Sequence, residues 1–106
     1  MPRWAIVIAH GDAESSRYYI DSELEGSESE ALAALHNAVD AFQKARRAKS
    51  IARQRRQVFR VSERSYFVRV NHGTYSGQAH FTLAELVADT HDDALPDTVA
   101  DLSAKP

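Results

Sequence analysis

One segment resembles a catalytic glycine motif in composition: residues 73–77 read Gly-Thr-Tyr-Ser-Gly. A nucleophile elbow places its serine midway between two glycines, as G-x-S-x-G, so that the hydroxyl stands on a sharp turn. Here Ser76 directly precedes the second glycine. The segment is better explained as a turn between two strands, and it predicts no nucleophile. The P-loop and G-x-G-x-x-G patterns, whose backbone amides hold nucleotide phosphates, do not occur.

The five histidines could supply imidazole for metal binding or for general base catalysis. None of them is spaced as H-x₃-H or H-E-x-x-H. If residues 73–77 form a hairpin turn, His72 and His80 would face each other, and a carboxylate such as Asp12 could complete a metal site. Two partly exposed sheet histidines are the simpler explanation. We therefore predict no metal and no other cofactor.

A run of carboxylates, Glu23, Glu25, Glu28 and Glu30, could supply a general acid and a general base. That chemistry requires burial, which shifts the pKa of one carboxyl away from that of the other. These residues surround a serine-rich helix start, where solvated acids favour the helix dipole. Since no nucleophile, base and orienting group converge in the sequence, we favour a non-catalytic protein and keep an enzyme as the third alternative, because catalytic sites can be assembled from distant residues.

Charge is distributed very unevenly along the chain, although the formal net charge is only −2. Residues 1–43 contain two basic and eight acidic residues, for a net charge of −6. Residues 44–69 contain ten basic and one acidic residue, for +9, and residues 70–106 contain one basic and six acidic residues, for −5. Such charge blocks indicate an electrostatic partner or a match between segments of the same chain.

The basic centre is the best candidate for a binding site. Cations at a helix C-terminus are favoured by the helix dipole, which explains the first of these charges but not the arginines beyond them. Strand alternation is expected to point Arg60, Phe67 and Arg69 outward. The residues expected inward are Phe59, Val61, Tyr66, Val68 and Val70. The predicted partner-binding residues are Arg46, Arg47, Lys49, Arg53, Arg55, Arg56, Arg60, Phe67 and Arg69.

Two classes of partner fit this segment. The first is another protein, or a second copy of the chain, because charge-complementary surfaces promote specific association and an outward Phe67 could anchor the contact. The second is a nucleic acid, since arginines around an aromatic ring can hold phosphates and stack bases. The acidic segments on either side would repel phosphate, so we favour a small binding module for a protein partner and keep nucleic acid as the alternative.

The patterning predicts five strands and two helices. A capping box at Ser27 and Glu30 begins a helix that contains no Gly or Pro and carries Leu35 and Val39 on its apolar face. A second capping box at Thr82 begins a short helix. The expected strands are residues 4–9, 17–20, 57–62, 65–71 and 78–81, and the expected helices are residues 28–49 and 82–89.

This order, β-β-α-β-β-β-α, predicts an α+β fold: a small antiparallel sheet packed on one long helix, in a β-grasp-like or split-βαβ-like arrangement. We expect a single domain over residues 1–91 and a disordered acidic tail over residues 92–106. The chain has no cysteine, which excludes disulfides, thiolate metal sites and a cysteine nucleophile. It has no apolar run long enough to span a membrane and no signal-peptide pattern, so we expect a cytoplasmic protein. Its ten arginines against three lysines are typical of a bacterial source.

Overall fold

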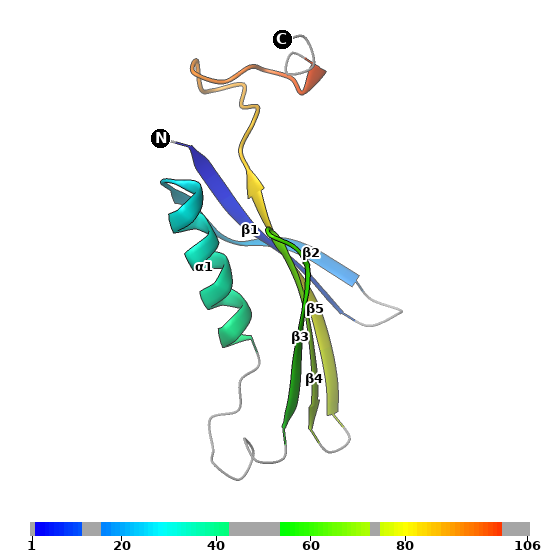
Figure 1. Cartoon of the computed structure of the whole chain (residues 1–106). Helices are drawn as coiled ribbons and strands as arrows, with labels where there is room; N and C mark the ends of the chain where they lie inside the picture. Colours follow the sequence, from blue (N-terminus) through cyan, green and yellow to red (C-terminus); the bar gives the residue numbers. More distant parts are fainter. Residues whose placement is uncertain (1, 12–15, 43–53, 73–74, 101–106) are drawn as a thin grey trace.

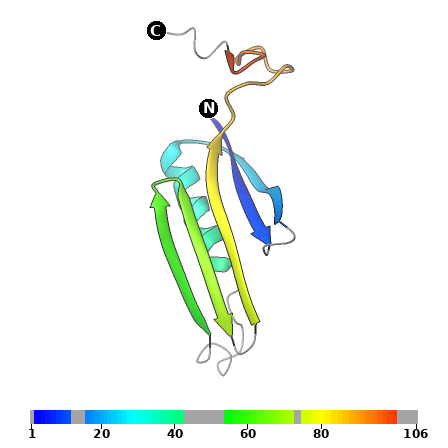
Figure 2. The ribbon, with the colours of Figure 1, turned by 90° about the vertical axis from the view of Figure 1, so that its right-hand side faces the viewer.

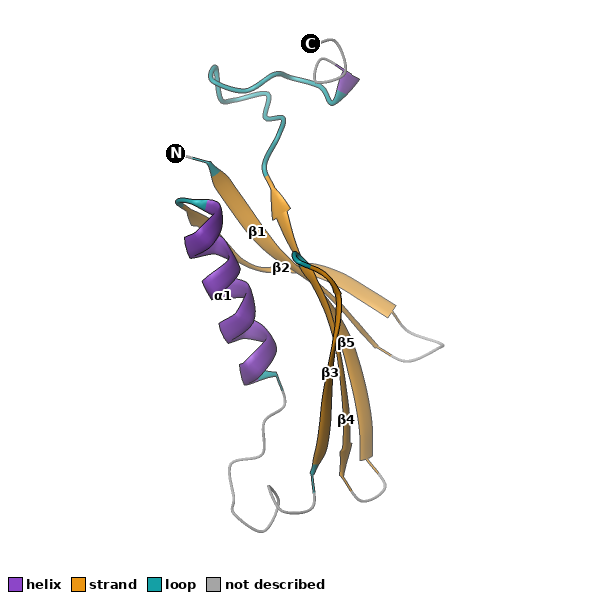
Figure 3. Ribbon diagram, in the orientation of Figure 1, coloured by secondary structure: helices purple, strands orange, loops and turns teal. Residues whose placement is uncertain are grey.

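The computed structural model describes residues 2–11, 16–42, 54–72 and 75–100 (Figure 1). It confirms a small α+β domain in which one helix packs on an antiparallel sheet (Figure 3). The elements are β1 (Arg3–Gly11), β2 (Ser16–Glu25), α1 (Glu28–Ala41), β3 (Arg55–Ser62), β4 (Ser65–His72) and β5 (Tyr75–Glu85).

The five strands form one sheet in the order β2-β1-β5-β4-β3, and every neighbouring pair is antiparallel. The first and last strands, β1 and β5, are therefore central neighbours. β2 and β3, which precede and follow α1, run in the same direction at opposite edges of the sheet. Figure 2 shows that α1 lies behind the sheet and that no helix or strand of the described residues covers the other face.

The helix begins as the sequence predicts. Ser27 accepts a hydrogen bond from the Glu30 amide, and the Glu30 carboxylate accepts one from the Ser27 amide, which completes the capping box. The helix ends at Ala41 with Phe42 as its C-cap, earlier than the expected residue 49. The basic residues 44–53 lie outside the described residues.

The core lies between α1 and the sheet face that it covers. Alternate residues of β1, β4 and β5 point toward the helix, which contributes one apolar face. A sheet of five strands is about 19 Å wide, whereas a helix is about 10 Å wide, so one helix covers mainly the central strands. The buried apolar residues are Trp4, Ile6, Ile8, Ala31, Leu35, Val39, Val68, Val70, Ala79, Phe81 and Leu83.

The second expected helix is wrong. Residues 82–85 continue β5, which pairs with β1 as far as Trp4 opposite Glu85. Phe81 and Leu83 are both buried, and the intervening Thr82 lies on the other face, which is the period of a strand. Pairing with a central strand therefore outweighs the local capping signal of Thr82 and Glu85.

The expected facing of β3 is also wrong. Phe59 lies directly opposite Phe67, and Arg60 lies opposite Tyr66. Because opposite residues of an antiparallel pair share a face, Phe59 points away from the helix and Arg60 toward the helix side. Val61 lies at an irregularity in the pairing and is 64% exposed. The inward placement of Val68, Val70 and Tyr66 is confirmed, since the first two are buried and Tyr66 packs against the core.

Residues 86–100 follow β5 without a further strand and lie beyond the end of the sheet (Figure 1). The Leu86 amide donates to the Arg3 carbonyl, and the Asp89 amide donates to the Pro96 carbonyl. The expected domain boundary at residue 91 stays a prediction. No helix among the described residues is long and apolar enough to cross a membrane.

Arg56 joins β3 to the end of the helix. Its guanidinium donates to the carbonyl of Phe42 at 3.2 Å and also to that of Val39. Carbonyls in the last helical turn lack partners within the helix, and a cation there also favours the helix dipole. Arg56 is thus part of the scaffold, because it caps the helix from the neighbouring edge strand.

Replacing Arg56 by Met should lower the free energy of unfolding by about 1–2 kcal/mol, because two helix carbonyls lose a charged donor. Arg55→Met is the matched control, since Arg55 is exposed on the other face of the same strand. Urea unfolding followed by circular dichroism measures both variants. Equal unfolding midpoints for the two would contradict the capping role.

Candidate functional site: the open face of the sheet

The face of the sheet opposite α1 is the main surface that the fold leaves uncovered (Figure 2). Strand alternation and the cross-strand register assign its residues. We call this surface the open face. It comprises Arg3, Ala5, Val7 and Ala9 on β1; Tyr18, Ile20, Glu23 and Glu25 on β2; Arg55, Gln57 and Phe59 on β3; Ser65, Phe67, Arg69 and Asn71 on β4; and Gln78, His80, Thr82 and Ala84 on β5.

The open face carries several large apolar side chains that are exposed. An antiparallel sheet that turns one face to water normally alternates apolar with polar residues along each strand. Here Tyr18 is 76% exposed, Ile20 is 57% exposed and Phe59 is 46% exposed. Val7 and Phe67 lie beside them and are half-buried. The exposed apolar side chains stand in two groups, one on β1 and β2 and one on β3 and β4, with polar residues of β5 between them.

A shallow hollow occupies one end of this face. It has a volume of about 490 Å³ and borders β1, β2 and the end of β5. Its lining consists largely of small and medium apolar side chains, namely Ala5, Val7, Ile20 and Ala84. Glu23 also lines the hollow. The hollow can therefore receive an apolar side chain, and Arg3 and Glu85 also line it.

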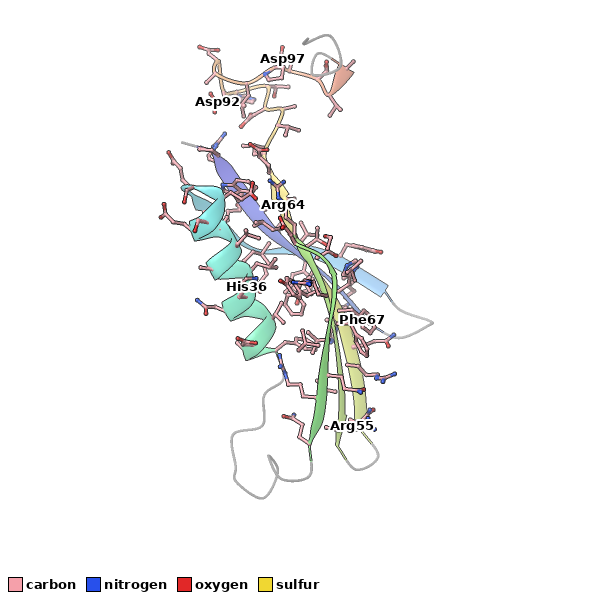
Figure 4. The ribbon with its side chains drawn as sticks, viewed as in Figure 1. His36, Arg55, Arg64, Phe67, Asp92 and Asp97 are labelled. Atoms are coloured by element: carbon pink, nitrogen blue, oxygen red, sulfur yellow. The ribbon has the colours of Figure 1, made fainter. Side chains whose placement is uncertain are left out.

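An aromatic pair stands on the other half of the open face. The ring centroids of Phe59 and Phe67 are 6.4 Å apart on neighbouring strands. The Arg69 guanidinium lies 5.5 Å from the Phe59 centroid and donates from Nε to Gln57 Oε1 at 2.9 Å. Figure 4 shows Phe67 pointing away from the helix. This half of the face presents rigid rings beside a cation.

A serine and a histidine meet in the middle of the face. Ser65 Oγ and His80 Nε2 are hydrogen-bonded, and Ser65 is buried. Nucleophilic catalysis requires a third group to orient the base and donors for an oxyanion. Within the described part of the chain, no carboxylate bonds to His80, so the pair lacks the orienting group of a triad. The described residues also contain no group of three potential metal ligands.

Opposite corners of the open face carry opposite charges. Glu23 and Glu25 lie on β2, at the end of the sheet where residues 86–100 leave it. Arg55 and Arg69 lie on β3 and β4, toward the other end (Figure 4). We call the first pair the acidic corner and the second pair the basic corner. The apolar residues lie between them.

A neighbouring arginine does not neutralise the acidic corner. Arg3 lies opposite Glu25 in the register, but its guanidinium binds Asp89 and Asp92 at 3.0 Å each. Hydrogen bonding from the His91 amide, reinforced by Arg3, holds the pKa of the Asp89 carboxyl below its ordinary value of 3.8, despite an opposing desolvation effect. The C-terminal segment therefore adds negative charge to this end of the sheet.

The structure divides the predicted binding residues between two faces. Phe67, Arg55 and Arg69 lie on the open face, whereas Arg56 and Arg60 lie on the helix side. Arg64 also lies on the helix side, where it binds Glu28 at 2.5 Å and stacks on the Trp4 ring. The basic centre is therefore not one continuous patch among the described residues. Arg46, Arg47, Lys49 and Arg53 lie outside the described residues.

The sequence reasoning missed the apolar half of the open face. Val7, Tyr18 and Ile20 were considered only as strand residues, because a buried strand and a strand with one bare apolar face have the same composition. One signal for this surface was available in the sequence: Tyr18 and Tyr19 are consecutive, so a strand must place one tyrosine on each of its faces. Comparison with models of protein families, with curated proteins and with solved structures finds no significant match to this chain.

The pH dependence of the C-terminal contact follows from Asp89. Because the pKa of its carboxyl is lowered in the folded state, the stabilising contact is fully present above the ordinary value of 3.8. It should be lost only as pH falls through the lower folded value. The ¹³C shift of the Asp89 carboxyl during an acid titration measures this. A titration midpoint for Asp89 at or above the ordinary value of 3.8 would contradict it.

Proposed function

We propose that the protein is a small non-catalytic binding module that engages another protein through the open face. The observation that supports this most is the exposed apolar surface of Tyr18, Ile20 and Phe59 on a sheet face that no element of the described fold covers. Exposed aromatic side chains surrounded by polar residues are typical anchors of protein interfaces.

The distribution of charge favours a protein over a nucleic acid. The full chain contains 13 basic and 15 acidic residues, so its formal net charge is −2 and it carries no overall excess of cations. Three of the arginines, Arg3, Arg56 and Arg64, are held in ion pairs or in the helix cap. A surface that binds phosphates requires an excess of available cations, because counterion release supplies most of the affinity. Only the basic corner meets that requirement on the open face.

A nucleic acid is the second candidate, and one observation favours it. Phe59 and Phe67 lie side by side on neighbouring strands with Arg69 beside them. Single-stranded nucleic acids stack their bases on aromatic rings of open sheets in this manner. This platform occupies one half of the open face and leaves the apolar half around Tyr18 unexplained.

Photocrosslinking distinguishes the two candidates. A benzophenone amino acid placed at Tyr18 in the full chain should form a protein adduct in the native cells, since this side chain is 76% exposed on the open face. The same group at Asn37, on the exposed side of α1, is the matched control and should form none. Adducts are resolved by gel electrophoresis and mass spectrometry, with nuclease treatment of a parallel sample.

A nuclease-sensitive adduct from Tyr18 would show that the open face binds a nucleic acid rather than a protein. Equal adduct formation from Tyr18 and Asn37, or none from Tyr18, would contradict the proposal that the open face is the binding surface.

A further inference from the structure

The edges of the sheet are poorly suited to pairing with another chain. On β2 the register moves from Ile6 opposite Ser22 to Val7 opposite Ile20, which leaves Asp21 as an extra residue in a bulge. On β3 the edge carries Arg55, Arg56 and Arg60. Bulges and edge cations are the usual devices that prevent strand addition. A partner that covers the exposed apolar residues should therefore lie on the open face rather than extend the sheet.

We propose that the partner on the open face is a second copy of this chain, packed face to face about a two-fold axis. The axis crosses the middle strand, β5, near His80 and Thr82, and it exchanges the two charged corners. This inference rests on the proposed function, since it names the protein that the open face binds.

Shape supports a reciprocal contact. The hollow and the aromatic pair lie on opposite sides of β5: the hollow borders β1 and β2, and the rings stand on β3 and β4. In a two-fold contact, every pairing occurs twice: if the aromatic pair of one copy meets the hollow of the other, then the hollow of the first copy also meets the aromatic pair of the second. The aromatic pair of each copy then fills the hollow of its partner, lined by small residues such as Ala5 and Ala84.

Charge supports the same axis. The acidic corner and the basic corner lie diagonally across the open face, with His80 near the midpoint of the register between Glu23 and Arg55. An axis that exchanges the hollow with the aromatic pair also places each acidic corner against the basic corner of the partner. Two complementary contacts then form at the rim, where they select one orientation.

The packing geometry belongs to a known class. An axis that exchanges diagonal corners runs at about 45° to the strands, so the strands of the two copies cross at roughly 90°, the orthogonal class of sheet packing. The open face spans about 19 Å across five strands and about 26 Å along eight residues. When two such faces cross at about 90°, they overlap over roughly 360 Å² in projection. The relief of the side chains adds to this area, which places the interface at the small end of the known range, below the ~800 Å² that each partner buries in a standard interface.

The oligomeric state of the full chain is the first test. Light scattering coupled to size exclusion, over a concentration series at low salt, should give twice the chain mass of 11.8 kDa at high concentration. A monomer at every concentration would overturn the second copy as the partner. A protein adduct from Tyr18 would then still support the proposed function, whereas a monomer with no such adduct would remove both.

Charge reversal tests the axis. Glu23→Arg with Glu25→Arg, or Arg55→Glu with Arg69→Glu, should each weaken the dimer by about tenfold, because like charges then meet at both rims. All four substitutions in one chain should restore it. The matched control is Asn37→Arg with Asp40→Arg, on the exposed side of α1 and therefore on the opposite side of the sheet from the open face (Figure 2). A dimer that the corner reversals leave unchanged, or that the four-fold variant does not restore, would overturn this geometry.

Crosslinking tests the position of the axis independently of charge. Because the chain has no cysteine, one can be introduced alone. Thr82→Cys, near the axis, should join two copies through a short bismaleimide linker, whereas Asn37→Cys on the exposed side of the helix should not. Circular dichroism confirms that each variant is folded. Linkage of Asn37→Cys in preference to Thr82→Cys would overturn the proposed arrangement.

Discussion

The structure depends on one geometric constraint: a single helix covers a sheet of five strands. A helix about 10 Å wide cannot cover a sheet about 19 Å wide, and it lies on one face only. The core is therefore confined to one side of β1, β5 and β4, and Tyr19 and Val58 remain exposed at the two edges. The other face of the same strands stays open in the described structure, and it is the face through which we propose that the protein binds a partner.

The arginines of the basic centre have two different structural settings in the fold. Arg56 and Arg64 belong to the scaffold, since the first caps the helix C-terminus and the second ties Glu28 and the Trp4 ring to the turn between β3 and β4. Arg55 and Arg69 face outward on the open face, and Arg69 lies beside the Phe59 ring. Adjacent arginines in the sequence thus lie on opposite sides of the sheet, one in the scaffold and one on the proposed binding surface, because neighbouring strand residues point to opposite faces.

Local sequence signals predicted those features of the fold that depend on residues close together in the chain. The capping box of Ser27 fixed the helix start, and the β-branched runs located the strands, because both depend on contacts within a few residues. The facing of Phe59 and the extension of β5 through Thr82 depend on which strand lies alongside, and such pairing is set by residues far apart in the chain. For the same reason the arginines were predicted as a site, while the surface around Tyr18 was not.

The crossover from β2 through α1 to β3 places the acidic and the basic segments of the sequence at opposite edges of the sheet. β2 belongs to the acidic first segment, and β3 and β4 belong to the basic second segment. Because the helix carries the chain from one edge of the sheet to the other, the two segments end at opposite sides of the open face. A surface with opposite charges at diagonal corners suits the two-fold contact that we propose, since such an axis brings each corner to its complement.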